Sequence, residues 1–246
     1  QRQMCIRDRW TRSLRITSDE RQDGLGNISS SPNRAELAMT IYDSIGGASD
    51  VWVLDLQRGI FGRRTFDGDS SRPIYSADGN YLIYQTEKLG LQSIAADGTG
   101  EPSLLFEGDS REIYPTSVSP TGDLIFTMGP PYDVYKLSAD QTAETEVIAE
   151  KLSLAPEPRP VIGAQISPDG KWLAYMSNET GEGQIFVRPF PEYTSGKWQA
   201  SVDTGAMPVW SPEMDQIFYW TVDYRLLSVP FSTETSDVRG DGQESI

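Results

Sequence analysis

Two copies of Gly-Asp-Ser, at Gly68–Ser70 and Gly108–Ser110, are the nearest this chain comes to a nucleophile motif. A serine nucleophile needs a neighbouring base to take its proton, and histidine is the usual one. The chain of 246 residues contains no histidine, so a Ser-His-Asp triad and a histidine-ligated zinc site are excluded. Both copies fall at the same place in an internal repeat, which indicates connecting loops.

Other groups of polar residues could bind ions or phosphates, but each pattern is incomplete. Asp67, Asp69 and Ser71 alternate as calcium ligands do, yet the later glycine and glutamate of a calcium loop are missing, which favours a solvated acidic turn over weak calcium binding. Gly24–Asn27 lacks the third glycine of a nucleotide-binding loop. Cys5 is the only cysteine, so no intrachain disulfide or thiolate cluster can form. Among 36 acids nothing selects a pair for glycoside hydrolysis. We therefore predict no catalytic residue, no metal and no cofactor.

Composition narrows the class of protein further. Hydrophobic residues make up 37% of the chain and aromatic residues 10%, which is enough for a packed core. The formal net charge is −15, and so acidic a surface repels phosphate backbones, so we predict no nucleic-acid partner. No apolar run approaches the ~20 residues that span a bilayer, so we predict no membrane segment.

An internal repeat predicts the secondary structure that would support any site. Five short turns recur at intervals of 45, 43, 48 and 44 residues: "SPNR" at Ser31, "SADG" at Ser76, "SPTG" at Ser119, "SPDG" at Ser167 and "SPEM" at Ser211. This period fits the four-stranded blade of a β-propeller, at ~40–50 residues per repeat. Helical repeats are excluded, because Gly and Pro interrupt every apolar run and no long segment has a 3.6-residue period.

Each repeat has the same predicted plan. A short strand enters the turn, and a nearly continuous apolar strand such as "WLAYM" follows it, as expected of a sheet covered on both faces. A third strand and a more polar outer strand complete the unit, the first of the outer strands being "RRTFD" (Arg63–Asp67). The predicted fold is an all-β propeller of four-stranded blades with five visible repeat anchors. Trp52, Trp172, Trp210 and Trp220 are expected in its core.

The two ends do not follow this plan. Met4–Arg9 ("MCIRDR") looks like a translated sequencing adapter, so residues 1–9 are predicted to be a scar. Residues 10–26 are predicted to hold the outer strand of a preceding or closing blade, residues 27–231 the blades, and residues 232–246 a polar tail without an obvious outer strand. We expect a fragment of a ring with six or more blades; a closed five-bladed ring is the alternative.

Residues Ser177–Pro212 contain "VRPFP", "GKWQ" and "PVWSP". They closely resemble the WD-like, TolB-type β-propeller repeats of bacterial proteins, in the version found C-terminal to some bacterial serine/threonine kinase or winged-helix regulatory domains. The repeat covers residues 13–231, and the close match is confined to the last two units. "SPNR" and "SPEM" depart from the family's Asp-Gly turn, so these two hairpins are expected to have looser turns.

The resemblance implies a non-catalytic module that binds a protein, peptide or other ligand, within a larger bacterial signalling or envelope protein. It favours an extracytoplasmic (periplasmic) location and leaves a cytoplasmic one open. The alternative is the substrate-gating propeller of a prolyl-oligopeptidase-like serine peptidase, whose hydrolase domain would lie outside this chain. That family's Gly-x-Ser-x-Gly elbow is absent here.

The loops between second and third strands are where we predict that a partner docks, because loops on a fixed scaffold carry specificity. They combine acids with two tyrosines, and an acidic rim with aromatic anchors suits a basic or mixed peptide surface. Solvated turns without a partner are the alternative. The predicted contact residues are Asp43, Asp50, Glu87, Tyr132, Asp133, Glu179, Glu182, Asp223 and Tyr224.

Overall fold

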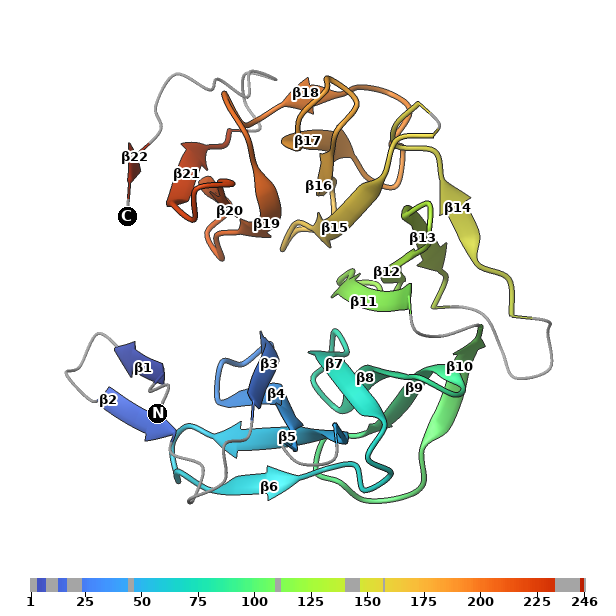
Figure 1. Cartoon of the computed structure of the whole chain (residues 1–246), viewed down its shortest axis with the longest axis vertical. Coiled ribbons are helices and arrows are strands. Elements are labelled where there is room, and N and C mark those ends of the chain that lie inside the picture. Colours follow the sequence, from blue (N-terminus) through green and yellow to red (C-terminus); the bar gives the residue numbers. More distant parts are fainter. Residues whose placement is uncertain are drawn as a thin grey trace.

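The structure is a computed structural model that describes residues 4–7, 13–16, 24–43, 47–108, 112–139, 147–156, 158–232 and 244–245. Five four-stranded antiparallel sheets follow one another along the chain, so the predicted all-β propeller is confirmed (Figure 1). Within the described residues no helix is long and apolar enough to cross a membrane.

Each sheet is one blade, and its four strands pair in chain order. Blade 1 contains β3 (Gly24–Ser30), β4 (Glu36–Tyr42), β5 (Ser49–Asp55) and β6 (Phe61–Arg63). Blade 2 contains β7 (Ser70–Tyr75), β8 (Tyr81–Thr86), β9 (Gly90–Ala95) and β10 (Ser103–Glu107). Blade 3 contains β11 (Ile113–Val118), β12 (Leu124–Met128), β13 (Asp133–Leu137) and β14 (Glu150–Leu152). Blade 4 contains β15 (Val161–Ile166), β16 (Trp172–Ser177), β17 (Gln184–Pro189) and β18 (Trp198–Gln199). Blade 5 contains β19 (Ala206–Trp210), β20 (Gln216–Trp220), β21 (Leu226–Pro230) and β22 (Glu244–Ser245).

The core lies between consecutive blades. Four hydrophobic clusters fill the junctions of blades 1 and 2, 2 and 3, 3 and 4, and 4 and 5. Tyr84, Tyr175 and Tyr219 occupy the same position in three second strands, and all three are fully buried. The second strands are apolar almost throughout because a neighbouring blade covers each face of their sheet.

The five anchor turns share one hydrogen-bond pattern. In each, the amide of the fourth residue donates to the carbonyl of the anchor serine, for example from Gly170 to Ser167 at 2.9 Å. The prediction of looser turns at Ser31 and Ser211 is wrong. Arg34 and Met214 stand in the glycine position and make the same bond at 2.8 and 3.0 Å, with φ of 58° and 60°.

Three further expectations need correction. The outer strand of blade 1 is Phe61–Arg63, not Arg63–Asp67. The fifth unit does have an outer strand, β22, which pairs with β21. Of the four tryptophans expected in the core, Trp210 is buried, Trp52 and Trp172 are partly buried, and Trp220 is 46% exposed.

The blades are arranged in an arc, and Figure 1 shows its opening between the first and last blades. On the blades that border the opening, Leu25 and Ile28 of blade 1 and Val209 of blade 5 are exposed. Outside the blades, β1 (Met4–Arg7) pairs with β2 (Ser13–Ile16) in a two-stranded sheet. The boundaries at residues 9, 26 and 231 and the size of the ring stay predictions.

Candidate partner-binding face

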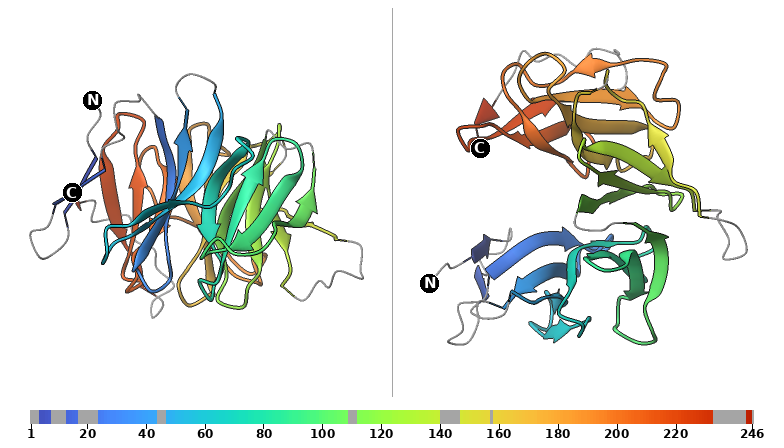
Figure 2. Two further views of the ribbon diagram at one scale, coloured as in Figure 1. Left: turned by 90° about the horizontal axis from the view of Figure 1, so that it is seen from below. Right: turned by 45° about the vertical axis from the view of Figure 1, so that its right-hand side comes forward.

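One face of the propeller collects the loops between second and third strands, which we call the loop face. The second strands of all five blades run in the same direction, so the loops that follow them emerge on one side, and the anchor turns lie on the other. Figure 2 shows the blades edge-on, with connecting loops at both ends of the strands. All nine predicted contact residues belong to loop-face segments or to the strand ends beside them.

Four of the predicted acids are in ion pairs within their own blade, and three of them, Asp50, Asp133 and Glu179, have side chains at most 15% exposed. Asp50 pairs with Arg63, and it also accepts hydrogen bonds from the Thr65 hydroxyl at 3.1 Å and the Gly68 amide at 3.3 Å. It therefore fixes the connection from blade 1 to blade 2. Its side chain is only 10% exposed, which leaves little carboxylate for a partner.

Asp133 and Glu179 have similar intrablade roles. Asp133 pairs with Lys151 at 2.9 Å. Glu179 pairs with Lys197, and its side chain is 7% exposed. The first pair joins the start of β13 to β14. The second pair joins the loop before β17 to the residue just before β18. These carboxylates stabilise the blades and contribute little charge to the loop face.

The exposed acids of the loop face are Asp43, Glu87, Glu182 and Asp223. Asp223 accepts hydrogen bonds from the Thr221 hydroxyl and from Arg225 Nε, and the Thr221 bond is the main reason that its pKa is lowered. The negative charge available to a partner therefore sits on blades 1, 2, 4 and 5.

The two predicted tyrosines lie in different surroundings. Tyr224 of blade 5 is 88% exposed with φ of 61°, and Trp220 and Val222, 46% and 74% exposed, precede it at alternate positions. Tyr132 of blade 3 is half-buried. Blade 4 separates them, so they belong to two separate parts of the loop face.

Tyr132 belongs to a cluster that joins blades 2 and 3. Its ring stacks on Tyr114, with centroids 6.2 Å apart, and the Arg72 guanidinium lies 4.2 Å from the centroid of the Tyr114 ring. A hydrogen bond to the Glu112 carboxylate is the main cause that raises the pKa of Tyr132. The other carboxylate oxygen, Oε2, is buried without a hydrogen-bond partner among the described residues. The cluster thus combines two partly exposed aromatic rings with one cation.

A β-bulge near the start of each first strand aims residues at the next blade. The pairing of first and second strands shifts register in all five blades. Three residues four positions before their anchor serine, Arg72, Gly163 and Met207, have positive φ. Arg72 reaches Tyr114 of blade 3, and a Cβ on Gly163 would lie 3.6 Å from Met207 Sδ of blade 5.

Sequence reasoning missed Arg72, Glu112, Tyr114, Trp220 and Val222. The repeat could have pointed to Arg72, because it stands four residues before its anchor serine, as Gly163 and Met207 do. A bulge redirects a side chain, and simple strand alternation does not reveal it.

Asp67, Asp69 and Ser71, which alternate in the sequence, lie at the turn that leads into β7. Asp67 accepts hydrogen bonds from the Asp69 amide at 2.9 Å and the Ser70 hydroxyl at 2.9 Å, so it organises the turn. Among the residues the structure describes, no group of three or more Cys, Asp and Glu could hold a metal.

Comparison with known proteins gives matches in structure only. No family model matches the sequence, and no curated protein matches it. A protein assigned as TolB from Agrobacterium tumefaciens superposes with a TM-score of 0.72 and 16% identity, over 95% of this chain and 83% of its own. TolB from Acinetobacter baumannii gives 0.70 and 16%, over 89% of this chain and 54% of its own.

An enzyme is among the similar structures as well. A chain from a study of two prolyl endopeptidases gives a TM-score of 0.55 and 14% identity, over 91% of this chain and 36% of its own. At such identities the likeness concerns the fold alone. The chain has the β-propeller fold of TolB proteins.

Proposed function

We propose that this chain is a non-catalytic binding module and that a protein or peptide docks on its loop face. The observation that carries the proposal is the cluster of Arg72, Tyr114, Tyr132 and Glu112. Tyrosine and arginine dominate the energetics of protein interfaces, because they combine a large contact area with directed hydrogen bonds.

The exposed acids supply the charge preference of the proposed site. Asp43, Glu87, Glu182 and Asp223 are exposed on the loop face and favour a basic or mixed segment. Asp50, Asp133 and Glu179 support the blades instead. The TolB-like fold supports a role in the cell envelope, and we propose an extracytoplasmic location.

The experiment compares capture of a partner by three single variants and one control. Tyr132→Ala, Tyr224→Ala and Glu182→Gln should each weaken a complex recovered by pull-down, and the Glu182 effect should shrink at high salt. Glu213→Gln changes an exposed acid on the opposite face and should leave capture intact. If the three variants are silent, the loop face is not the docking surface.

The similarity to a prolyl endopeptidase chain supports a second candidate function, that of a propeller that gates substrate access to a hydrolase domain. A gating propeller would sit in the same gene as a hydrolase domain. Reading the gene in both directions separates the two: an upstream regulatory domain supports the binding module, and a downstream hydrolase supports the gate.

A further inference from the structure

The anchor turns of neighbouring blades pack on one another through a proline and a glycine. A Cβ added to Gly79 of the second turn would lie 3.3 Å from Pro32 Cδ of the first. A Cβ added to Gly170 of the fourth turn would lie 3.0 Å from Pro120 Cδ of the third. At these two junctions the pyrrolidine ring of one turn fills the space beside the next.

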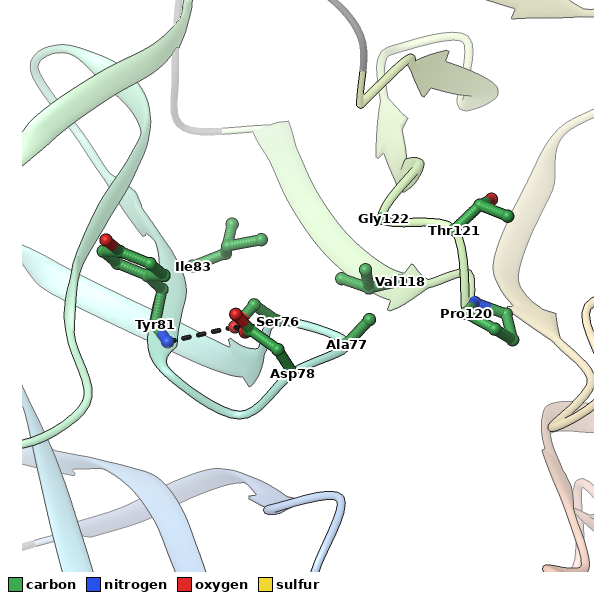
Figure 3. A pocket seen from close by; sticks show the side chains of 9 residues that line it. All are labelled: Ser76, Ala77, Asp78, Tyr81, Ile83, Val118, Pro120, Thr121 and Gly122. Carbon is green, nitrogen blue, oxygen red and sulfur yellow. Dashed lines mark hydrogen bonds between the residues drawn. The ribbon is translucent and has the colours of Figure 1, made fainter.

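The second turn lacks this proline. Ala77 stands where Pro32, Pro120, Pro168 and Pro212 stand in the other four turns. A Cβ added to Gly122 of the third turn would meet Ala139, and Ala77 is not among its near neighbours. A hollow of about 460 Å³ opens between the second and third turns, and Figure 3 shows Ala77 facing Val118 and Pro120 across it.

The lining of the hollow combines an apolar floor with an acidic, aromatic rim. Ile83 and Val118 form the floor, and the ring of Tyr81, which is 51% exposed, stands at one side. The Asp78 carboxylate is exposed on the rim, and a hydrogen bond from Ser76 is the main cause that lowers its pKa, so the group is ionised near neutrality. No lysine or arginine is among the residues that line the hollow.

We propose that this hollow binds an extended segment of a partner protein in which a proline, flanked by basic residues, occupies the place left open by Ala77. The proline ring lies against Gly122 and the floor, as Pro32 lies against Gly79. The volume exceeds that of one pyrrolidine ring and leaves room for the backbone on either side. Tyr81 supplies the flat apolar contact, and Asp78 attracts the basic flank. The site lies on the face opposite the loop face and does not depend on the function proposed there.

The test uses two capped peptides, one with a single proline between two arginines and one with alanine in place of that proline. Calorimetric titration of the whole chain should show saturable binding of the proline peptide. Its alanine counterpart should bind about tenfold more weakly, a factor that corresponds to 1.4 kcal/mol. Amide chemical shifts should move at Ala77, Val118 and Gly122.

Ala77→Pro is the decisive variant, because it fills the hollow from within. Four of the five turns already carry proline there, so the variant should fold, with a raised thermal midpoint, and should lose the proline peptide. Pro212→Ala, at the last turn, should bind as the unchanged chain does. The proposal is overturned if Ala77→Pro retains the peptide or if the alanine peptide binds equally well. It is also overturned if the unchanged chain binds neither, or if Ala77→Pro abolishes only self-association of the chain.

Discussion

Arg34 and Met214 adopt a left-handed backbone conformation that the other three anchor turns assign to glycine. A side chain in this conformation costs roughly 1–2 kcal/mol, because Cβ crowds the following carbonyl oxygen. The turns keep their hydrogen bonds nevertheless. The strain at these two positions is therefore balanced by the packing of the hairpins around them.

Replacing Arg34 by glycine should stabilise the protein. Arg34 is exposed, so little packing is lost, and relief of the strain should raise the free energy of unfolding by about 0.5–1 kcal/mol after the added flexibility of the unfolded chain is counted. Gly170→Ala is the inverse control: its φ is 74° and its Cβ would crowd Pro120, so it should destabilise. Urea denaturation measures both. A lower midpoint for Arg34→Gly would contradict the strain argument.

Tyr175 makes stability depend on alkaline pH. Burial is the main cause that raises its pKa to about 12, and its hydroxyl donates to the Leu154 carbonyl at 2.9 Å. The unfolded value is about 10. Because the folded pKa is the higher one, the contribution of the neutral Tyr175 side chain to the free energy of unfolding is fully present below pH ~10. It is lost as the pH rises through the folded pKa.

Tyr175→Phe should flatten that part of the stability curve while lowering stability at neutral pH. Burial also raises the pKa of Tyr84 to about 12, so the remaining slope in the variant should come in part from Tyr84. Denaturation curves between pH 8 and pH 12, with phenolate absorbance, report both effects. A curve with the same alkaline slope in the variant and the unchanged chain would exclude Tyr175 as the source.

At the scale of the element, the junction of blades 4 and 5 depends on edge-to-face aromatic contacts. Trp210 meets Phe231 with centroids 4.8 Å apart, and Trp172 meets the same ring at 5.3 Å. Trp210 Nε1 also donates to the Gln165 carbonyl of blade 4 at 2.9 Å. Phe231, which directly follows β21, thus contacts one tryptophan from each of the two blades.

Truncating Trp210 to alanine should cost roughly 3–5 kcal/mol, the range for large buried aromatics. Trp172→Ala should cost less, since that ring is only partly buried. Trp220→Ala provides the matched control, because it removes an equal volume from a side chain that is 46% exposed. Thermal unfolding of the three variants should rank them in this order. Equal losses for Trp210 and Trp220 would be incompatible with this junction.

The repeated turns allowed the blades to be predicted from sequence, because each turn is a local structure fixed by Ser, Pro, Asp and Gly within four residues. Features that depend on distant partners were not predictable. The ion pair between Asp50 and Arg63 depends on two strands of the folded blade, and β22 pairs only after a stretch that has no strand signal. The loop face could be predicted as a set of loops. The sequence pattern did not predict that Glu179 is buried or that Arg72 contacts blade 3, because both depend on how the strands and blades pack in the fold.

At the scale of the whole molecule, the opening of the arc exposes surfaces that the inner blades cover. Ile74 of blade 2 packs against the cluster shared with blade 3, whereas Val209, its counterpart in blade 5, is 55% exposed. Trp220 and Val222 of the same blade are also exposed, at 46% and 74%. Exposed apolar patches and sheet faces of this kind promote association.

The isolated chain should therefore self-associate in a concentration-dependent way. Val209→Thr combined with Val222→Thr should shift the equilibrium toward the monomer without loss of fold. Sedimentation velocity over a range of concentrations provides the measurement. A compact monomer at every concentration would show that the opening is covered within the molecule.

Each described hydrophobic cluster joins only two consecutive blades, and this should determine where the molecule first unfolds locally. Blades 1 and 5 each share a described hydrophobic cluster with one neighbour, whereas blades 2, 3 and 4 share clusters with two. Local opening should then begin at the two outer blades and advance inward, as fraying does in a linear array. Amide hydrogen exchange should be fastest in β4 and β20 and slowest in β12, so that protection peaks at the middle of the chain.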